Sequence, residues 1–85
     1  MNEEFDIVNE KIDDAVLALL SLTLHDVHEA GARAWKGHDW DVLGRLYEKG
    51  LIHDPVGRAK SVGLTAEGLA RSRELFKQLF ARKSD

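Results

Sequence analysis

The chain has 85 residues, which suits one domain with a single core, and 44% apolar and 32% charged residues are typical of a globular protein. The absence of cysteine excludes disulfides, zinc–thiolate sites and cysteine nucleophiles. The longest apolar stretch, residues 15–24, is about half of the ~20 residues that cross a bilayer, and it follows acidic residues instead of a basic signal region. We therefore expect a cytoplasmic protein without membrane association.

The net charge of −3 is unevenly distributed along the chain. Residues 1–30 carry eight acidic side chains and one basic side chain, Lys11, whereas the remainder carries eleven basic and seven acidic ones. Two interpretations stay open. Each helix has an ordinary solvated face, or the acidic end associates with a basic end of a partner or of a second copy.

The first predicted element is a helix from Asn9 to about Leu24, and Asn9 or Asp13 is the expected cap. Residues 1–8 either extend this helix or fray. Apolar side chains recur at spacings of three and four, which predicts that they share one buried face. They are Phe5, Val8, Ile12, Ala15, Val16, Leu19 and Leu20.

A short second helix is expected over residues 27–34, followed by a well-marked helix over residues 40–49. Asp39 is a typical N-cap, Asp41 suits the first turn because of the helix dipole, and Gly50 is a typical stop signal. The side chains predicted to face the core are Leu43, Leu46 and Tyr47.

The segments 51–55 and 60–65 predict a two-stranded hairpin that turns at Gly57, and Thr65 is expected to cap a last helix over 66–83. The broad apolar face of that helix comprises Leu69, Leu75, Phe76, Leu79 and Phe80. The predicted fold is mainly α with a small β-hairpin. It is a single winged-helix-like domain, residues 1–85, with helices, a two-stranded wing and a C-terminal helix.

Two resemblances support this fold. The run "LGRLYEKGLI", a basic turn and then "LTAEGLARSRELF" resemble the core of MarR- and PadR-type winged-helix regulators over residues 39–80. The whole chain is similar to a family of small bacterial proteins without an assigned function, through "RAWKGHDWD", "RLYEKGLI" and "DPVGRAKSV". The second resemblance is the closer one, and it implies a fold without implying an activity.

The regulator resemblance implies that residues 40–49 form a DNA-recognition helix and that the hairpin forms a wing. The side chains that would contact DNA are Arg45, Lys49, Arg58 and Lys60. Asp39 and Asp41, at the leading end of the helix, would repel phosphates. DNA binding is therefore the alternative function and not the first one.

Histidines raise the question of a metal site, with His25, His28 and His38 as weak candidates. A pair of histidines three residues apart, without a third ligand nearby in sequence, is a weak motif, so we interpret them as polar loop residues. Ser21, His25 and Asp26 are not at a spacing that selects a catalytic set. We expect no metal, no cofactor and no enzymatic activity.

Trp35 and Trp40 are interpreted as structural, with Trp40 packed back over the core, because buried aromatic side chains dominate small cores. The alternative is that an exposed tryptophan anchors another protein. The leading function is protein interaction or self-association through the first and last helices. The expected interaction surface comprises Trp35, Leu75 and Leu79.

Overall fold

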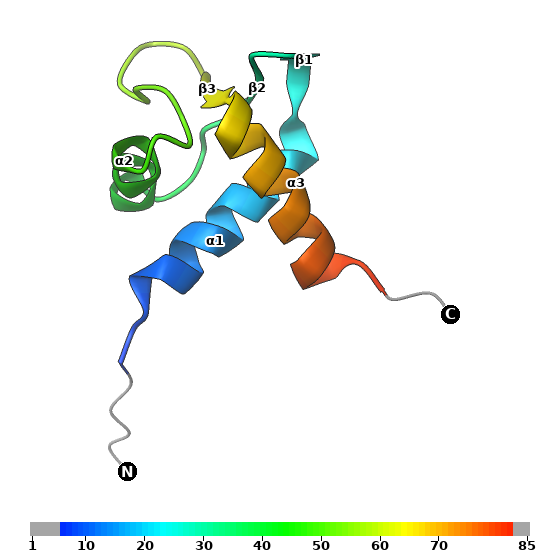
Figure 1. The fold of residues 1–85 in the computed structure, drawn as a ribbon. Coiled ribbons are helices and arrows are strands. Elements are labelled where there is room, and N and C mark those ends of the chain that lie inside the picture. Colours follow the sequence, from blue (N-terminus) through cyan, green and yellow to red (C-terminus); the bar gives the residue numbers. More distant parts are fainter. Residues whose placement is uncertain (1–5, 83–85) are drawn as a thin grey trace.

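The computed structural model describes residues 6–82 as three helices and a three-stranded antiparallel sheet (Figure 1). In chain order the elements are α1 (Asn9–Leu20), a 3-10 turn η1 (Ser21–Thr23), β1 (His25–His28), β2 (Gly31–Trp35), α2 (Trp40–Glu48), β3 (Ser61–Thr65) and α3 (Ala66–Phe80). This mixed arrangement is compatible with the predicted winged-helix-like class. In the described part of the chain, no helix is long and apolar enough to cross a membrane. Phe5, which was predicted to face the core, lies outside the described residues.

The sheet has the order β1-β2-β3. Strand β2 pairs with β3 in continuous register, from Gly31 opposite Thr65 to Trp35 opposite Ser61. Its pairing with β1 contains a register shift. Gly31 has a φ of 147°, and a side chain there would collide with the carbonyl oxygen of Leu64. Glycine is therefore required where the chain enters the central strand.

The prediction of a helix over residues 27–34 was wrong, because this segment forms most of the β1–β2 hairpin. The reason is visible in the alternation of β2, where Ala32 and Ala34 are buried while Arg33 and Trp35 point away from the core. A period of two fits a strand with one buried face. The predicted winged-helix order had a short helix before the helix over residues 40–49, and the structure has the β1–β2 hairpin in that place.

The predicted wing is present in reduced form. Its second strand is β3. Its first strand is reduced to a single bridge between Ile52 and Leu64. Beside this bridge, the His53 N–H donates a hydrogen bond of 2.8 Å to the Gly63 carbonyl. Residues 53–60 form an irregular loop. The segment contains Pro55, which lacks an N–H donor for a longer ladder.

Several helix boundaries match the sequence signals. The Asp39 carboxylate accepts a hydrogen bond from the Val42 N–H, and the Thr65 hydroxyl accepts one from the Gly68 N–H, so both predicted caps are confirmed. Gly50 follows α2 with a φ of 76°, as a stop signal requires. The predicted cap of the first helix was wrong, since α1 begins directly after Val8 and Asn9 is its first residue.

The core lies between the sheet and the inner sides of the helices. Helices α1 and α3 cross where the Ser72 hydroxyl donates to the Leu17 carbonyl, 2.6 Å, and lies 2.7 Å from the Ser21 hydroxyl. Beyond this crossing the N-terminal half of α1 and the C-terminal half of α3 diverge (Figure 1). The apolar core comprises Leu17, Ala18, Leu20, Ala32, Ala34, Val42, Leu43, Leu46, Ile52, Val62, Leu64, Leu69 and Leu75.

Candidate functional site

The most prominent surface feature is an exposed apolar face along α1. Val8, Ile12 and Leu19 were predicted to be buried, but they are exposed. The prediction is confirmed for Leu20, and the helix turns Leu17 and Ala18 inward beside it. The outward-facing residues follow spacings of four and three, so they lie along one side of the helix. We call this face the outer stripe. It comprises Ile12, the half-buried Ala15 and Leu19 of α1, with Val8 directly before the helix and Leu22 in η1 after it.

The rotation of α1 is explained by Asp13, a charged residue that is only 1% exposed. The Nε of Arg45 donates to both Asp13 carboxylate oxygens, at 2.9 and 3.0 Å, and the Arg45 Nη2 lies 2.7 Å from Oδ1. The Lys49 Nζ lies 2.8 Å from Oδ2. Two cations on α2 thus bind a carboxylate on the inner side of α1, and this places the outer stripe on the far side.

The ion pairs also determine the charge state of Asp13. The hydrogen bond from Arg45 holds the pKa of the Asp13 carboxyl below its ordinary value, with Lys49 adding to the effect and burial opposing it. Asp13 in turn raises the pKa of the Arg45 guanidinium. Arg45 and Lys49, which were predicted as DNA contacts, are therefore directed into the fold, toward α1.

A second apolar surface lies at the free end of α3. Leu75 was predicted to belong to an interaction surface, but it is 4% exposed and is part of the core, so this assignment was wrong. Leu79 and Phe80 are each 52% exposed, and the Phe80 ring packs edge-on against Phe76, with 5.3 Å between centroids. They lie in the last turn of α3, whose C-terminal half diverges from α1 (Figure 1).

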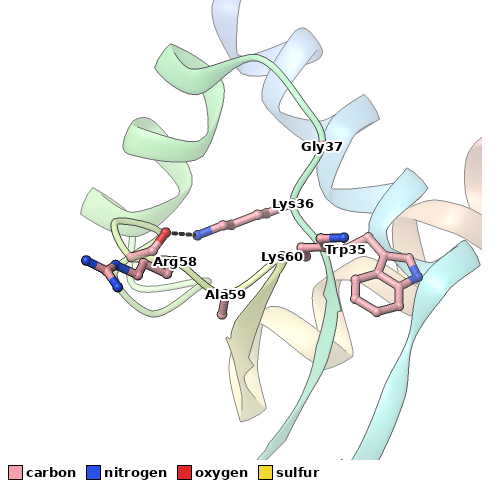
Figure 2. A pocket seen from close by; sticks show the side chains of 7 residues that line it. Trp35, Lys36, Gly37, Arg58, Ala59 and Lys60 are labelled. Carbon is pink, nitrogen blue, oxygen red and sulfur yellow. Dashed lines mark hydrogen bonds between the residues drawn. The ribbon is translucent and has the colours of Figure 1, made fainter.

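A hollow of about 540 Å³ lies between the end of β2 and the loop before β3. Figure 2 shows Lys36 reaching from the end of β2 toward this loop, with Trp35 and Arg58 on opposite sides. The Lys36 Nζ donates to the carbonyls of Pro55 and Gly57, at 2.6 and 3.0 Å, so it holds the loop. We call this feature the basic hollow, and its lining consists of Trp35, Lys36, Gly37, Gly57, Arg58, Ala59 and Lys60.

The basic hollow contains the two predicted wing cations. Arg58 and Lys60 are exposed, and neither forms an ion pair with any residue between 6 and 82. The described residues that line the hollow include three basic side chains and no acidic one. Asp39 and Asp41 follow shortly after Gly37 in sequence, at the start of α2.

The interpretation of both tryptophans as buried was wrong, because Trp35 is 51% and Trp40 is 54% exposed. Tyr47, also predicted to face the core, is exposed as well. Trp35 follows the strand alternation that directs it away from the core, and its indole packs on His25 with 4.9 Å between ring centroids. Trp35 therefore remains a candidate anchor at the edge of the basic hollow.

The candidate metal ligands do not come together. The His25 Nδ1 lies 2.9 Å from the Thr23 carbonyl, and the His28 Nδ1 accepts a hydrogen bond from the Ala30 N–H. His38 lies in the turn before α2. Within residues 6–82, no three histidine, aspartate or glutamate side chains are grouped as a metal ion requires. A smaller hollow of about 270 Å³ near His28 and His53 also includes Arg33.

Comparison with known proteins connects this architecture to a family. Residues 8–82 match the family described as "Domain of unknown function (DUF6429)". The chain belongs to this family. "Uncharacterized protein y4hR" of Sinorhizobium fredii (strain NBRC 101917 / NGR234) is 58% identical over 77 residues, which cover 91% of this chain and 99% of that relative. No solved structure matches the chain.

Membership of the DUF6429 family confirms the predicted similarity to a family without an assigned function. The resemblance to MarR- and PadR-type regulators stays a prediction. Sequence reasoning missed Asp13 as the contact that orients α1, because it was interpreted as a helix-start residue. The available signal was an aspartate between Ile12 and Leu17, on a helix whose apolar residues are too many for one face.

Proposed function

We propose that this chain is a non-enzymatic interaction module that binds protein through the outer stripe of α1. The observation that carries the proposal is the exposure of Val8, Ile12, Leu19 and Leu22 at the spacing of a helix-packing seam. A helix with apolar side chains on two opposite sides is typical of one that is covered on both. The inner side of α1 is covered by the core, which leaves the outer stripe for a partner.

The composition of the stripe supports an interface. Asn9, Lys11 and Val16 flank it, so it is bordered by a single charge although α1 as a whole is acidic. Depletion of charge at the centre of a contact area distinguishes interfaces from ordinary surface. The non-enzymatic part of the proposal is supported by the side chains of Ser21 and His25, which are engaged with Ser72 and Thr23 and not with one another.

The proposal is tested by photo-cross-linking in bacterial cells. A photoreactive benzoylphenylalanine in place of Leu22 should give covalent protein adducts after irradiation, because Leu22 is exposed on the stripe. The matched control places the same group at Val56, which is exposed on the loop before β3. An equal adduct pattern at both positions, or no adduct at Leu22, would contradict the proposal.

The second candidate function is nucleic-acid binding of the MarR or PadR type, and the basic hollow supports it. Arg58 and Lys60 extend from a wing-like loop, and the exposed ring of Trp35 lines the same hollow on the side opposite Arg58. Basic side chains next to an exposed aromatic ring suit phosphates and stacked bases. In this form of the proposal the loop and Trp35 bind, and α2 contributes little because Asp13 holds Arg45 and Lys49.

Fluorescence anisotropy with labelled single-stranded and duplex DNA tests this candidate. Binding should weaken steeply between about 50 and 200 mM salt, and the double substitution Arg58→Ala, Lys60→Ala should remove it. The exchange Arg58→Lys, Lys60→Arg keeps both charges and should retain most of the affinity. Absence of binding at the lowest salt concentration would rule the candidate out.

A further inference from the structure

We infer that the partner of the outer stripe is a second copy of this chain, joined about a two-fold axis with the two α1 helices packed antiparallel. This inference rests on the proposed interaction function and names its partner. Most symmetric dimers use the same surface on both subunits, which requires a self-complementary patch. The outer stripe is such a patch because its apolar side chains extend on both sides of Ala15.

The order of residues along α1 supports the helix–helix contact. From Val8 to Leu22 the apolar positions are separated by four, three, four and three residues, which is the spacing of the seam between two packed helices. Ala15, the smallest side chain, is at the centre of the series. A small residue at the centre allows two helices to approach closely, while the larger side chains interlock on either side.

The charges on α1 favour the antiparallel direction. Asp6 and Glu10 place negative charge at the start of the helix. A parallel pair would bring the two acidic starts together, whereas an antiparallel pair separates them by the length of the helix. The antiparallel pair also opposes the two helix dipoles favourably. The flanking residues Asn9, Lys11 and Val16 create no like-charge contact in this direction, because residue 11 then lies near Leu19 of the other copy.

The exposed apolar area of the stripe and of the free end of α3 together approaches that of a stable dimer. Seven large apolar side chains at these two places are each 36% to 68% exposed, namely those of residues 7, 8, 12, 19, 22, 79 and 80. With about 200 Å² for a fully exposed large side chain, positions 8, 12, 19 and 22 of the stripe correspond to roughly 370 Å² per chain, and Ile7, Leu79 and Phe80 outside the stripe to roughly 340 Å². A contact of the ~800 Å² that each partner buries in a standard interface therefore has to cover the free end of α3 as well as the stripe. The divergence of α3 from α1 leaves its free end accessible to the second copy (Figure 1).

Sedimentation equilibrium of the purified chain tests the inference. The mass over the micromolar range should approach twice the 9.5 kDa of one chain. Two glutamates in the stripe, Ile12→Glu with Leu19→Glu, should raise the dissociation constant at least about 100-fold. The control pair Val27→Glu with Val56→Glu adds the same charges at exposed apolar positions outside the stripe and should leave the dimer intact. Circular dichroism confirms that each variant is folded.

A cross-link tests the antiparallel direction. Because the chain lacks cysteine, Ala15→Cys introduces a single thiol at the centre of the proposed seam. A short bismaleimide should join two Ala15→Cys chains efficiently, and Val56→Cys and Val8→Cys chains poorly, since residues 8 of the two copies lie at opposite ends. Efficient joining at residue 8 would overturn the antiparallel arrangement.

The outcomes separate this inference from the proposed function. A wild-type chain that stays monomeric, or a stripe variant that still dimerises, overturns the inference. If the chain is monomeric while the Leu22 photo-cross-linker still forms adducts with a different protein, the interaction function stands and its partner is heterologous. If the chain is monomeric and Leu22 forms no adduct, both proposals fail.

Discussion

The Asp13 carboxylate on α1 is bound by the Arg45 guanidinium on α2, with the Arg45 Nη2 at 2.7 Å from Oδ1 and the Nε at 2.9 Å. This ion pair connects two helices through residues that are 32 positions apart in sequence. Its geometry determines which side of α1 meets the core, because a charged group that is removed from water needs its partners on the same side. Asp13 therefore lies on the same inward side of α1 as the core residues Leu17, Ala18 and Leu20, and the outer stripe lies on the opposite side.

The first prediction concerns the stability that this contact provides. Asp13→Asn should lower the free energy of unfolding by about 1–3 kcal/mol, because it removes the ion pairs with Arg45 and Lys49. The loss is limited because the two partners are partly exposed and regain water. Urea denaturation measures the change. Asp14→Asn is the matched control, since Asp14 meets Arg71 at 3.9 Å with both side chains well exposed, and it should change stability by less than ~1 kcal/mol.

The second prediction concerns pH. Because the pKa of Asp13 is lowered in the folded state, its contribution is fully present above the pKa of the unfolded chain and is lost as the pH falls toward the folded-state value. The stability difference between the wild type and Asp13→Asn should be constant above about pH 5 and should shrink below about pH 3.9. Urea titrations at several pH values test this. A difference that grows on acidification would show that the sign is wrong.

The third prediction concerns the entry to β2. Gly31→Ala should destabilise the fold by about 1–3 kcal/mol, because the backbone has a φ of 147° and the added Cβ meets the Leu64 carbonyl. Gly37→Ala is the control, since a Cβ added at that position would have no neighbouring atom within 4 Å. Thermal unfolding followed by circular dichroism compares the two. Equal melting temperatures would argue against this strand geometry.

The fourth prediction concerns the tryptophans. Trp40→Ala should cost less stability than Leu43→Ala, although tryptophan is much larger, because Trp40 is half-exposed whereas Leu43 is completely buried. Truncation of a buried leucine costs about 2–5 kcal/mol, part of which comes from the cavity that remains. Denaturant unfolding of both variants gives the comparison. A greater loss for Trp40→Ala would place its ring in the core after all.

The sequence predicted the second half of the fold well, and the reason is local. Asp39, Gly50 and Thr65 act on backbone groups within a few residues of themselves, so their effect on helices α2 and α3 can be recognised without the tertiary structure. Residues 51–55 were predicted to form a strand, but they form only a single bridge at Ile52. Its pairing depends on β3 and on the loop between them, and neither is specified by the segment itself.

The first half was predicted less well because two long-range contacts decide it. The rotation of α1 depends on cations in α2, and the strand state of residues 31–35 depends on pairing with β3, some 30 residues later. The spacing of apolar residues identified α1 as a helix and also identified a coherent apolar side. It could not show that this side faces outward, since periodicity carries no information on which side meets the core.

The junction between β3 and α3 has a mechanical consequence. Thr65 is both the last residue of the strand and the cap of the helix, and its hydroxyl also contacts the carbonyls of Gly50 and Leu51. Helix α3 follows β3 without a linker residue, and its 15 residues extend about 22 Å at 1.5 Å per residue. Because Ser72 fixes the middle of α3 on Leu17 of α1, a tilt of α3 at Thr65 would also move α1, so the end of β3, α1 and the far end of α3 are geometrically coupled.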